Sequence, residues 1–433
     1  MAPGRWSRTA TALAVGACLA LAGCGDDPAA DGTTTITFWD DNGGPARTPV
    51  WEHMIAEFEK ENPTIKVKYV GIPIAQVQQK YDTAIAGGGL PDVGGVTTAM
   101  LANLAAREVL EPMDERLSGS ALDGKLNEQV VDTVKATVPD EKLYMVPLST
   151  NLGVFWYRAD WFAEAKISPP ANWDEFYSAV EKLTDRPNNR YGYTIRGGAG
   201  SISQLLEVLY GQSGIDEVFD SSGESTVNDP GNVEALERIA GLYKKVTPEA
   251  DVTNDYVKMV AQFDGGNIGV MQHNLGSYTD HVETLGEDKV DAMFVPAGED
   301  GTRTVTSHPV TGLGVFAAGE QRDAAFRFAE FVAGKEMNTY WATETGVLPA
   351  NTEVADAAGL EHITRAAQVL SDPGTTLVQL PYYLPEFNSI TKTDAEPQFQ
   401  KVLLGELSAR DFLDEMAGKL TEAQASYDER NGG

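Results

Sequence analysis

Residues 35–69 read TITFWDDNGGPARTPVWEHMIAEFEKENPTIKVKY, and this stretch contains the pattern that decides the fold. Residues 35–39 predict a short strand. Apolar side chains then recur at helical spacing, at Trp51, Met54, Ile55 and Phe58. Pro63 ends the predicted helix, and residues 65–69 alternate apolar side chains with lysine, which predicts a second strand.

The alternation of strands and helices continues along the chain. A second helical stripe lies at Val77, Tyr81, Ala84 and Ile85, and the three glycines at 87–89 close it. Residues 92–96 predict a third strand. Because strands alternate with helices, we expect parallel pairing and an α/β layer architecture.

A second α/β unit is predicted beyond residue 150. Asn172 is placed to cap a helix, with Glu175 reaching back to it. The buried side of this helix is predicted at Trp173, Phe176, Val180 and Leu183. Two further helix-rich stretches follow, at residues 233–245 and 323–333.

The first 23 residues have the pattern of a secretory signal peptide. Arg5 and Arg8 precede an apolar run at residues 9–21, which is shorter than the ~20 residues that a bilayer-spanning helix needs. Leu21-Ala22-Gly23-Cys24 resembles the bacterial lipobox, whose cysteine takes a diacylglyceryl thioether. The alternative is an ordinary cleavage site with a chance cysteine. We expect residues 1–23 to be a signal peptide and 24–34 a tether lipidated on Cys24.

The mature chain is strongly acidic and cannot form an internal disulfide. Its only other cysteine, Cys18, lies in the segment that is removed. Removal of 23 residues from 433 leaves 410, enough for two domains with buried cores. The whole chain has a formal net charge of −31, so it repels nucleic acid phosphates and has no electrostatic reason to lie on anionic lipid. We therefore expect no nucleic acid partner.

The order of several motifs resembles the family 1 extracellular solute-binding proteins of the maltose-binding type. In the first third these motifs are Ile36-Thr37-Phe38-Trp39, Phe58 to Pro63, Gly89 to Val93 and Leu110 to Asp114. Later ones are Val146-Pro147, Val154 to Arg158, Ser168-Pro169-Pro170, Asn172 to Phe176, Ala325 to Val332 and Tyr340-Trp341 to Pro349. Each motif is weak alone, but their order and spacing cover essentially the whole mature chain.

This resemblance implies a type II periplasmic-binding fold, in which two α/β lobes joined by a multi-crossing hinge close around a solute. It places lobe 1 at residues 35–149 plus about 312–350, and lobe 2 at 150–311 plus about 351–433. The family mostly carries sugars and oligosaccharides and delivers them to a membrane ABC permease. The implied protein is thus an extracytoplasmic, monomeric substrate-binding protein of an ABC transporter. Together with the lipidation expected on Cys24, it would be lipid-anchored, and we expect no cofactor and no metal.

Ligands in open α/β sheets bind beyond the carboxyl ends of the strands, so the loops that follow strands are the first candidates. Trp39 ends the first strand and is followed by Asp40, Asp41 and Asn42. An indole face suits the C–H side of a sugar ring, and a carboxylate accepts hydrogen bonds from hydroxyl groups. The alternative for Trp39 is a tryptophan of the core, and the alternative for the two aspartates is a solvated turn.

Two further candidate segments belong to the third strand and to the first passage between the lobes. Alignment with maltose-binding protein places Thr97 and Thr98 in the ligand loop, whereas Ala99 replaces an acidic sugar-binding residue, which argues against maltodextrin specificity. Asp92 is expected to cap local backbone and stays outside the site. Asn151 aligns with a cleft-facing acid, and its amide both donates and accepts hydrogen bonds; the alternative is a hinge hydrogen bond.

In the second lobe, Ile195 is predicted to end a strand, and the loop at residues 197–204 offers Ser201 and Gln204. The alternative is a flexible surface loop. The strand at residues 268–271 leads into further candidates. Directly after this strand these are His273, Asn274 and Tyr278, the last in place of the family's stacking aromatic. Another candidate, His308, lies close to a passage between the lobes. Tyr382, Tyr383 and Phe387 resemble the family's late aromatic cluster, with a core stripe as the alternative. The alternative for His308 is a structural role in a turn.

The chain lacks the common signatures of an exported enzyme. It contains no His-Glu-x-x-His metal motif, no Gly-x-Ser-x-Gly elbow and no Walker loop, and its five histidines show no metal-ligand spacing. A pair of glycosidase carboxylates stays open, because the chain has 64 acidic residues. A non-sugar solute and a role as a sensor co-receptor also stay open.

Overall fold

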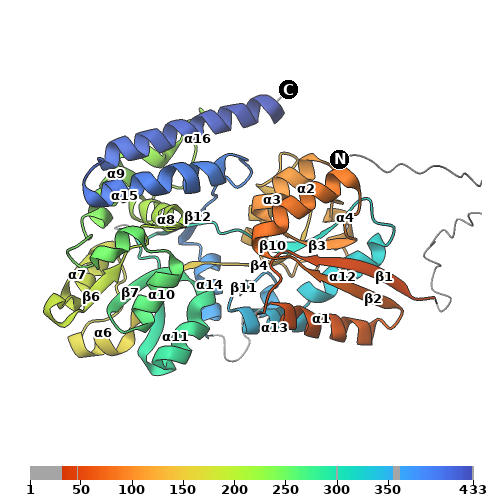
Figure 1. Ribbon diagram of the computed structural model, residues 1–433, viewed down its shortest axis with the longest axis horizontal. Helices are drawn as coiled ribbons and strands as arrows, with labels where there is room; N and C mark the ends of the chain where they lie inside the picture. Colours follow the sequence, from red (N-terminus) through yellow and green to blue (C-terminus); the bar gives the residue numbers. More distant parts are fainter. Residues whose placement is uncertain (1–31, 46, 299–300, 355–360, 432–433) are drawn as a thin grey trace, which may run out of the picture.

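The fold is described from a computed structural model that covers residues 32–45, 47–298, 301–354 and 361–431. The predicted signal peptide and the predicted lipidation site, Cys24, lie outside the described residues. Two lobes lie side by side, each built around its own sheet (Figure 1). We call the lobe with the six-stranded sheet the first lobe and the lobe with the four-stranded sheet the second lobe.

The first-lobe sheet has the strand order β11-β4-β10-β3-β1-β2. Its strands are β1 (Thr34–Asp40), β2 (Ile65–Gly71), β3 (Val93–Thr97), β4 (Val146–Thr150), β10 (Thr311–Val315) and β11 (Leu348–Pro349). β1 pairs in parallel with both β2 and β3, so the parallel unit predicted from residues 35–96 is confirmed. β10 pairs antiparallel with β3 and β4, and β11 pairs antiparallel with β4.

The helices of the first lobe bury the apolar stripes that the sequence shows. They are α1 (Thr48–Glu61), α2 (Val77–Gly87), α3 (Thr98–Ala106), α4 (Asp114–Leu117), α5 (Glu128–Lys135), α12 (Arg322–Ala333) and α13 (Lys335–Thr345). The ring of Phe38 in β1 lies 4.6 Å from that of Trp51 in α1 and 5.3 Å from that of Phe328 in α12. The sheet core is therefore closed by helices from both ends of the lobe's sequence.

Asp92 binds backbone, but not locally as predicted. Its Oδ2 accepts a hydrogen bond from the N–H of Thr37 across 2.8 Å. Thr37 lies in β1 and Asp92 directly precedes β3, so this carboxylate ties together two neighbouring strands.

The second-lobe sheet has the strand order β6-β7-β5-β8. Its strands are β5 (Gly153–Arg158), β6 (Tyr191–Thr194), β7 (Ile268–Asn274) and β8 (Val290–Phe294). β6 and β7 are parallel, whereas β5 runs antiparallel to both β7 and β8, so parallel pairing throughout was the wrong expectation. β5 enters directly from the first lobe without a helical crossover. Because only parallel neighbours require such a crossover, β5 is free to pair antiparallel. A separate parallel pair joins β9 (Arg303–Thr306) and β12 (Thr375–Val378).

The helices of the second lobe surround this sheet and include the C-terminal pair α15 and α16 (Figure 1). They are α6 (Ala159–Ala165), α7 (Trp173–Leu183), α8 (Ser201–Ser213), α9 (Pro230–Ala240), α10 (Tyr256–Asp264), α11 (Tyr278–Leu285), α14 (Glu361–Ser371), α15 (Glu396–Leu404) and α16 (Ala409–Asn431). A π-helical segment at Ser389–Ala395 precedes α15. The helix predicted to reach residue 245 ends at Ala240, because the chain turns from Gly241 onward.

The capping residues of α7 act almost as predicted. Oδ1 of Asn172 accepts a hydrogen bond from the N–H of Glu175 across 2.9 Å. The side chain of Glu175 reaches back to the N–H of Ala171, across 2.8 Å, rather than to that of Asn172. The helix start is therefore fixed from both sides, with one hydrogen bond shifted by one residue.

In the described part of the chain, connections between the lobes follow β4, β9 and β11. Residues 151–152 link β4 to β5, and we call them the first crossing. Residues 307–310 link β9 to β10 and form the second crossing, while the connection from β11 to α14 includes residues that are not described. The multi-crossing arrangement expected for the fold is thus present, whereas the lobe borders given above stay a prediction.

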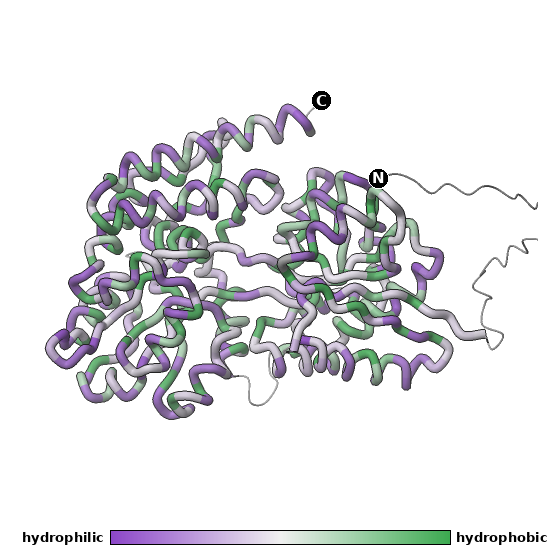
Figure 2. The backbone as a smooth tube through the Cα atoms, viewed as in Figure 1, coloured by the Kyte–Doolittle hydropathy of each residue, from purple (hydrophilic) through white to green (hydrophobic). Residues whose placement is uncertain are grey.

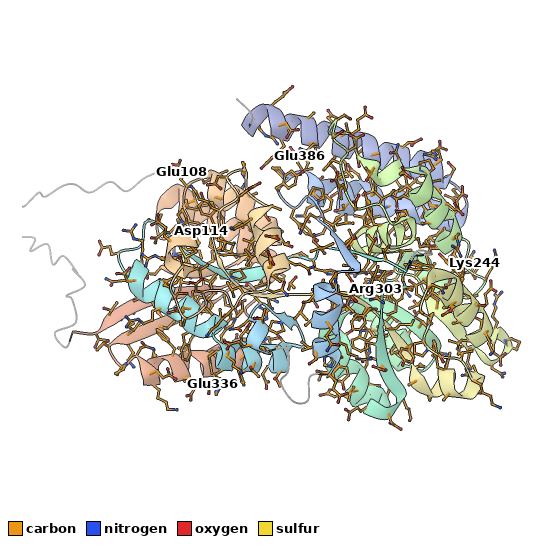
Figure 3. All side chains as sticks on the ribbon, turned by 180° about the vertical axis from the view of Figure 1, so that it is seen from behind. Glu108, Asp114, Lys244, Arg303, Glu336 and Glu386 are labelled. Carbon is orange, nitrogen blue, oxygen red and sulfur yellow. The ribbon has the colours of Figure 1, made fainter. Side chains whose placement is uncertain are left out.

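Each lobe has a hydrophobic interior under a charged surface. The helices alternate hydrophobic and hydrophilic residues along their length (Figure 2), and the buried hydrophobic residues form one large cluster in each lobe. Of the charged residues labelled in Figure 3, Glu108, Asp114 and Glu336 belong to the first lobe and Lys244, Arg303 and Glu386 to the second. In the described part of the chain, no helix combines the length and the apolar character that crossing a bilayer requires.

Candidate functional site

A cavity of about 250 Å³ lies against the second crossing, mainly on the second lobe. Six of the residues predicted from the sequence line it: Gln204, His273, Asn274, His308, Tyr382 and Phe387. Of the described first-lobe residues, Ala99 alone reaches it. The cavity therefore combines second-lobe side chains with the segment that leads into the first lobe.

One side of the cavity is formed by α8 against β7. Nε2 of Gln204 donates to the carbonyl of Gln272 across 2.9 Å, and Nε2 of Gln272 is within 3.1 Å of the carbonyl of Gln204. The same Nε2 of Gln272 donates to Oε2 of Glu207 across 2.8 Å. This reciprocal pair holds the helix and the strand in a fixed relation beside the cavity.

His273 and Asn274 come from the end of β7. Nδ1 of His273 lies 3.0 Å from Oγ of Ser277, and its ring stacks on that of Tyr256 with centroids 5.7 Å apart. Burial lowers the pKa of His273 to about 3, with Arg196 adding to the shift, so this imidazole is neutral at physiological pH. Oδ1 of Asn274 accepts from the N–H of Gly276 across 3.1 Å, which leaves its amide nitrogen for other partners.

Aromatic rings form another wall of the cavity. The hydroxyl of Tyr382 donates to the carbonyl of Ser307 in the second crossing across 2.9 Å. The ring of Phe387 meets that of Tyr382 edge-on, with centroids 5.6 Å apart. Next to them, Nε2 of His308 lies 3.7 Å from Oε1 of Glu207. A polyhydroxylated solute would find apolar ring surface and both hydrogen-bond donors and acceptors here.

A family model for the bacterial extracellular solute-binding proteins matches residues 44–339, well over half of the chain. The chain belongs to this family. The resemblance seen in the sequence motifs is thereby confirmed, and with it the assignment to a family of proteins that act outside the cytoplasm.

Relatives of this solute-binding protein agree with the assignment. A binding protein of Brucella abortus (strain 2308) is 25% identical over 311 residues, which cover 71% of this chain and 74% of that protein. The mannitol-binding protein of Pseudomonas aeruginosa is 26% identical over 393 residues, covering 82% and 86% respectively. The sugar-binding protein MalE from Xanthomonas citri has a similar structure, with a TM-score of 0.77, 23% identity and coverage of 91% and 98%. The type II periplasmic-binding fold predicted from the sequence is therefore confirmed.

In this solute-binding protein, Trp39 and Asp40 lie in the first lobe away from the cavity. Trp39 is only 8% exposed and its ring centroid lies 5.4 Å from that of Tyr81. Nζ of Lys80 covers the ring at 4.4 Å from its centroid. Asp40 is fully buried and accepts hydrogen bonds from the hydroxyl of Tyr69 at 2.8 Å and the N–H of Asn42 at 3.1 Å. In the structure, the ring of Trp39 packs against neighbouring side chains. The carboxylate of Asp40 holds the backbone of Asn42 and the hydroxyl of Tyr69 in place.

Asp41 and the two threonines are also held by the first lobe itself. Burial raises the pKa of Asp41 to about 6, against the opposing charge of Arg47. The hydroxyl of Thr98 accepts from the N–H of Val310 across 3.2 Å, which joins the start of α3 to the second crossing. Thr97 ends β3 and precedes α3 without making a side-chain cap.

Asn151 and Ser201 carry buried oxygens without a hydrogen-bond partner in the described part of the chain. Oδ1 of Asn151 is such an atom, and Asn151 lines a second, smaller hollow together with Thr150 and His308. Oγ of Ser201 is another. The prediction that a loop runs to Gln204 was wrong. Gly200 adopts a φ of +82°, and α8 begins directly after it, at Ser201.

Two of the predicted aromatic residues do not reach the cavity. Tyr278 stacks on His362 with ring centroids 3.9 Å apart, and it lines a different hollow beside Asp291. Tyr383 donates its hydroxyl to Gln424 and packs against Tyr427 of α16. The structure therefore separates Tyr382 from its neighbour Tyr383.

The cavity also contains charged residues that the sequence reasoning missed. These are Arg196, Glu207 and Lys392. Arg196 directly follows the predicted end of a strand, so the same rule that selected other loop residues could have found it. Glu207 lies inside a helix and Lys392 inside a π-helical segment, and nothing in their spacing marks them. In the described residues no cluster of His, Cys, Asp and Glu could hold a metal ion.

Proposed function

We propose that this protein captures a sugar or a short oligosaccharide by hinge closure and delivers it to the permease of an ABC transporter. The observation that supports this most is the cavity at the second crossing, where polar side chains from α8 and β7 face the rings of Tyr382 and Phe387. A site that contacts the segment between two lobes gains solute contacts when the lobes move together.

The solutes of two similar proteins favour a hydroxyl-rich ligand. The relative from Pseudomonas aeruginosa is named a mannitol-binding protein, and the structure from Xanthomonas citri is described as a sugar-binding protein. Both kinds of ligand present several hydroxyl groups on a compact carbon frame. A solute of another class, or a sensor partner in place of a permease, is the alternative.

We further propose that the protein binds its solute without chemical change and acts as a lipid-anchored monomer. The acyl chains on Cys24 would keep it at high effective concentration beside the permease. An exported glycoside-acting enzyme is the less favoured alternative. Intact mass of membrane-extracted protein tests the anchor, since a chain without a diacylglyceryl thioether contradicts it.

A thermal-shift screen tests the proposed function. D-mannitol, D-glucose, maltose and maltotriose are added to the purified protein at millimolar concentration. A compound at 100 times its dissociation constant should stabilise the folded protein by about 2.7 kcal/mol. Chromatography of the recovered compound should show no turnover. The proposal fails if none of the four raises the unfolding temperature, and a hydrolysed oligosaccharide would favour the enzyme instead.

A further inference from the structure

α8 places a buried carboxylate beside the cavity. Glu207 is 2% exposed, and its Oε2 accepts the hydrogen bond from Gln272 described above. Its Oε1 is sealed from solvent and has no hydrogen-bond partner among the described residues. A buried acceptor without a donor is unfavourable, and more so when it belongs to a carboxylate. The fold therefore keeps Oε1 of Glu207 buried at a cost in stability, and a functional role would explain that cost.

The start of β5 and the second crossing both approach the same carboxylate. Gly153 follows the first crossing, and a Cβ at this position would lie 2.0 Å from each carboxylate oxygen of Glu207. The space that Glu207 fills thus exists only because residue 153 is glycine. From the second crossing, Nε2 of His308 lies 3.7 Å from Oε1, which is within ion-pair reach but too long for a hydrogen bond.

A second buried oxygen without a hydrogen-bond donor lies on a hollow that His308 of the second crossing also lines. Oδ1 of Asn151, in the first crossing, is buried without a donor among the described residues. Asn151 and His308 line one small hollow, and Glu207 and His308 line the main cavity. His308 therefore borders two hollows, and each is also lined by a residue whose buried acceptor lacks a donor among the described residues. A small shift of the second crossing relative to α8 would bring the Nε2 of His308 within hydrogen-bond distance of Glu207.

We propose that Glu207 is a positioning residue that acts through His308 when the lobes close on a solute. In the closed form Oε1 accepts a hydrogen bond from Nε2–H of His308. In the neutral tautomer that this bond selects, the other ring nitrogen, Nδ1, is an acceptor. Nδ1 accepts a hydrogen bond from a hydroxyl group of the solute. This inference rests on the proposed function and names the solute group that the site selects.

A double-mutant cycle tests the pair. Glu207→Gln, His308→Gln and the double variant are titrated with whichever of D-mannitol, D-glucose, maltose and maltotriose stabilises the wild type. Each single variant should lower the affinity about tenfold, and the double variant should be no weaker than the weaker single one. Additive losses, or affinities equal to that of the wild type, would overturn the inference while leaving the proposed function intact.

A spectroscopic measurement on the wild-type protein covers the case in which a variant does not fold. The chain has five histidines, so selective ¹⁵N labelling of histidine gives an assignable spectrum. On addition of the binding compound, the ¹⁵N shifts of His308 should move to those of the Nε2–H tautomer. A His308 spectrum that the compound leaves unchanged contradicts the role given to Glu207. If none of the four compounds binds, the proposed function fails first and this inference falls with it.

Discussion

The backbone N–H of Ile195, directly after β6, donates a hydrogen bond to Oδ2 of Asp251 across 2.8 Å. Nδ2 of Asn254 donates to the other carboxylate oxygen, also across 2.8 Å. Asp251 is fully buried, and this burial raises its pKa to about 7 although the hydrogen bond from Ile195 opposes the shift. The residue next to Ile195 is Arg196, which lines the cavity, so this buried carboxyl supports the site from behind.

We expect Asp251 to make folding stability depend on pH. The folded-state pKa lies above the unfolded value of about 3.9, so the folded protein holds this proton more tightly. The resulting stabilisation is present at low pH and is lost as the pH rises from about 4 to about 7. The free energy of unfolding of Asp251→Asn, relative to wild type, should therefore rise by up to about 4 kcal/mol between pH 4 and 8.

Urea unfolding of both proteins at several pH values measures this difference. A constant offset between them is expected, because an amide cannot accept both hydrogen bonds, and it does not affect the pH trend. Asp41 also has a raised pKa, so it changes stability with pH in the same direction. Because both proteins contain Asp41, its effect cancels in the difference between their free energies of unfolding. A difference that does not change with pH would show that Asp251 does not titrate in this range.

Trp39→Ala should destabilise the protein rather than abolish solute binding. The indole packs against Tyr81 and beneath Lys80, and truncation of a buried tryptophan costs about 3–5 kcal/mol. Calorimetric titration at a temperature where the variant stays folded should give a dissociation constant close to that of the wild type. A large loss of affinity with unchanged stability would restore the ligand-stacking role that the sequence suggested.

Gly153→Ala should be destabilising, and a second change should correct it. The added methyl group collides with the carboxylate of Glu207, and such overpacking costs about 1–3 kcal/mol. Shortening the neighbour in Gly153→Ala/Glu207→Ala removes the collision. The double variant should therefore be more stable than the sum of the two single effects predicts. Additive effects in thermal unfolding would show that the two residues do not share this space.

The sequence predicts the lobes well because their elements are locally specified. The stripe from Trp51 to Phe58 and the alternation at residues 65–69 each need only a short segment to be recognised, and both are confirmed. The antiparallel direction of β5 was not predictable in this way. It depends on how the chain passes between lobes, which no local pattern encodes.

The site is harder to predict because residue type does not distinguish a cavity wall from a core. Trp39 and Tyr278 have the rings expected at a sugar site, yet both pack against other side chains outside the cavity. Glu207 reaches the cavity only because α8 is hydrogen-bonded to β7 and because Gly153 leaves room for it. These are relations between segments far apart in sequence, and only the fold reveals them.

Two adjacent tyrosines provide a matched test of where the solute binds. Tyr382 lines the cavity and its hydroxyl is bonded to Ser307 of the second crossing, whereas Tyr383 points to Gln424 in α16. Each Tyr→Phe change removes one hydroxyl and keeps the ring. We expect Tyr382→Phe to weaken solute binding about threefold to tenfold, the equivalent of one neutral hydrogen bond, because the second crossing loses its tie to the aromatic wall. Tyr383→Phe should leave the dissociation constant unchanged, since its hydroxyl contacts neither the cavity nor a crossing. Equal effects of the two variants in calorimetric titration would mean that the solute does not bind in this cavity.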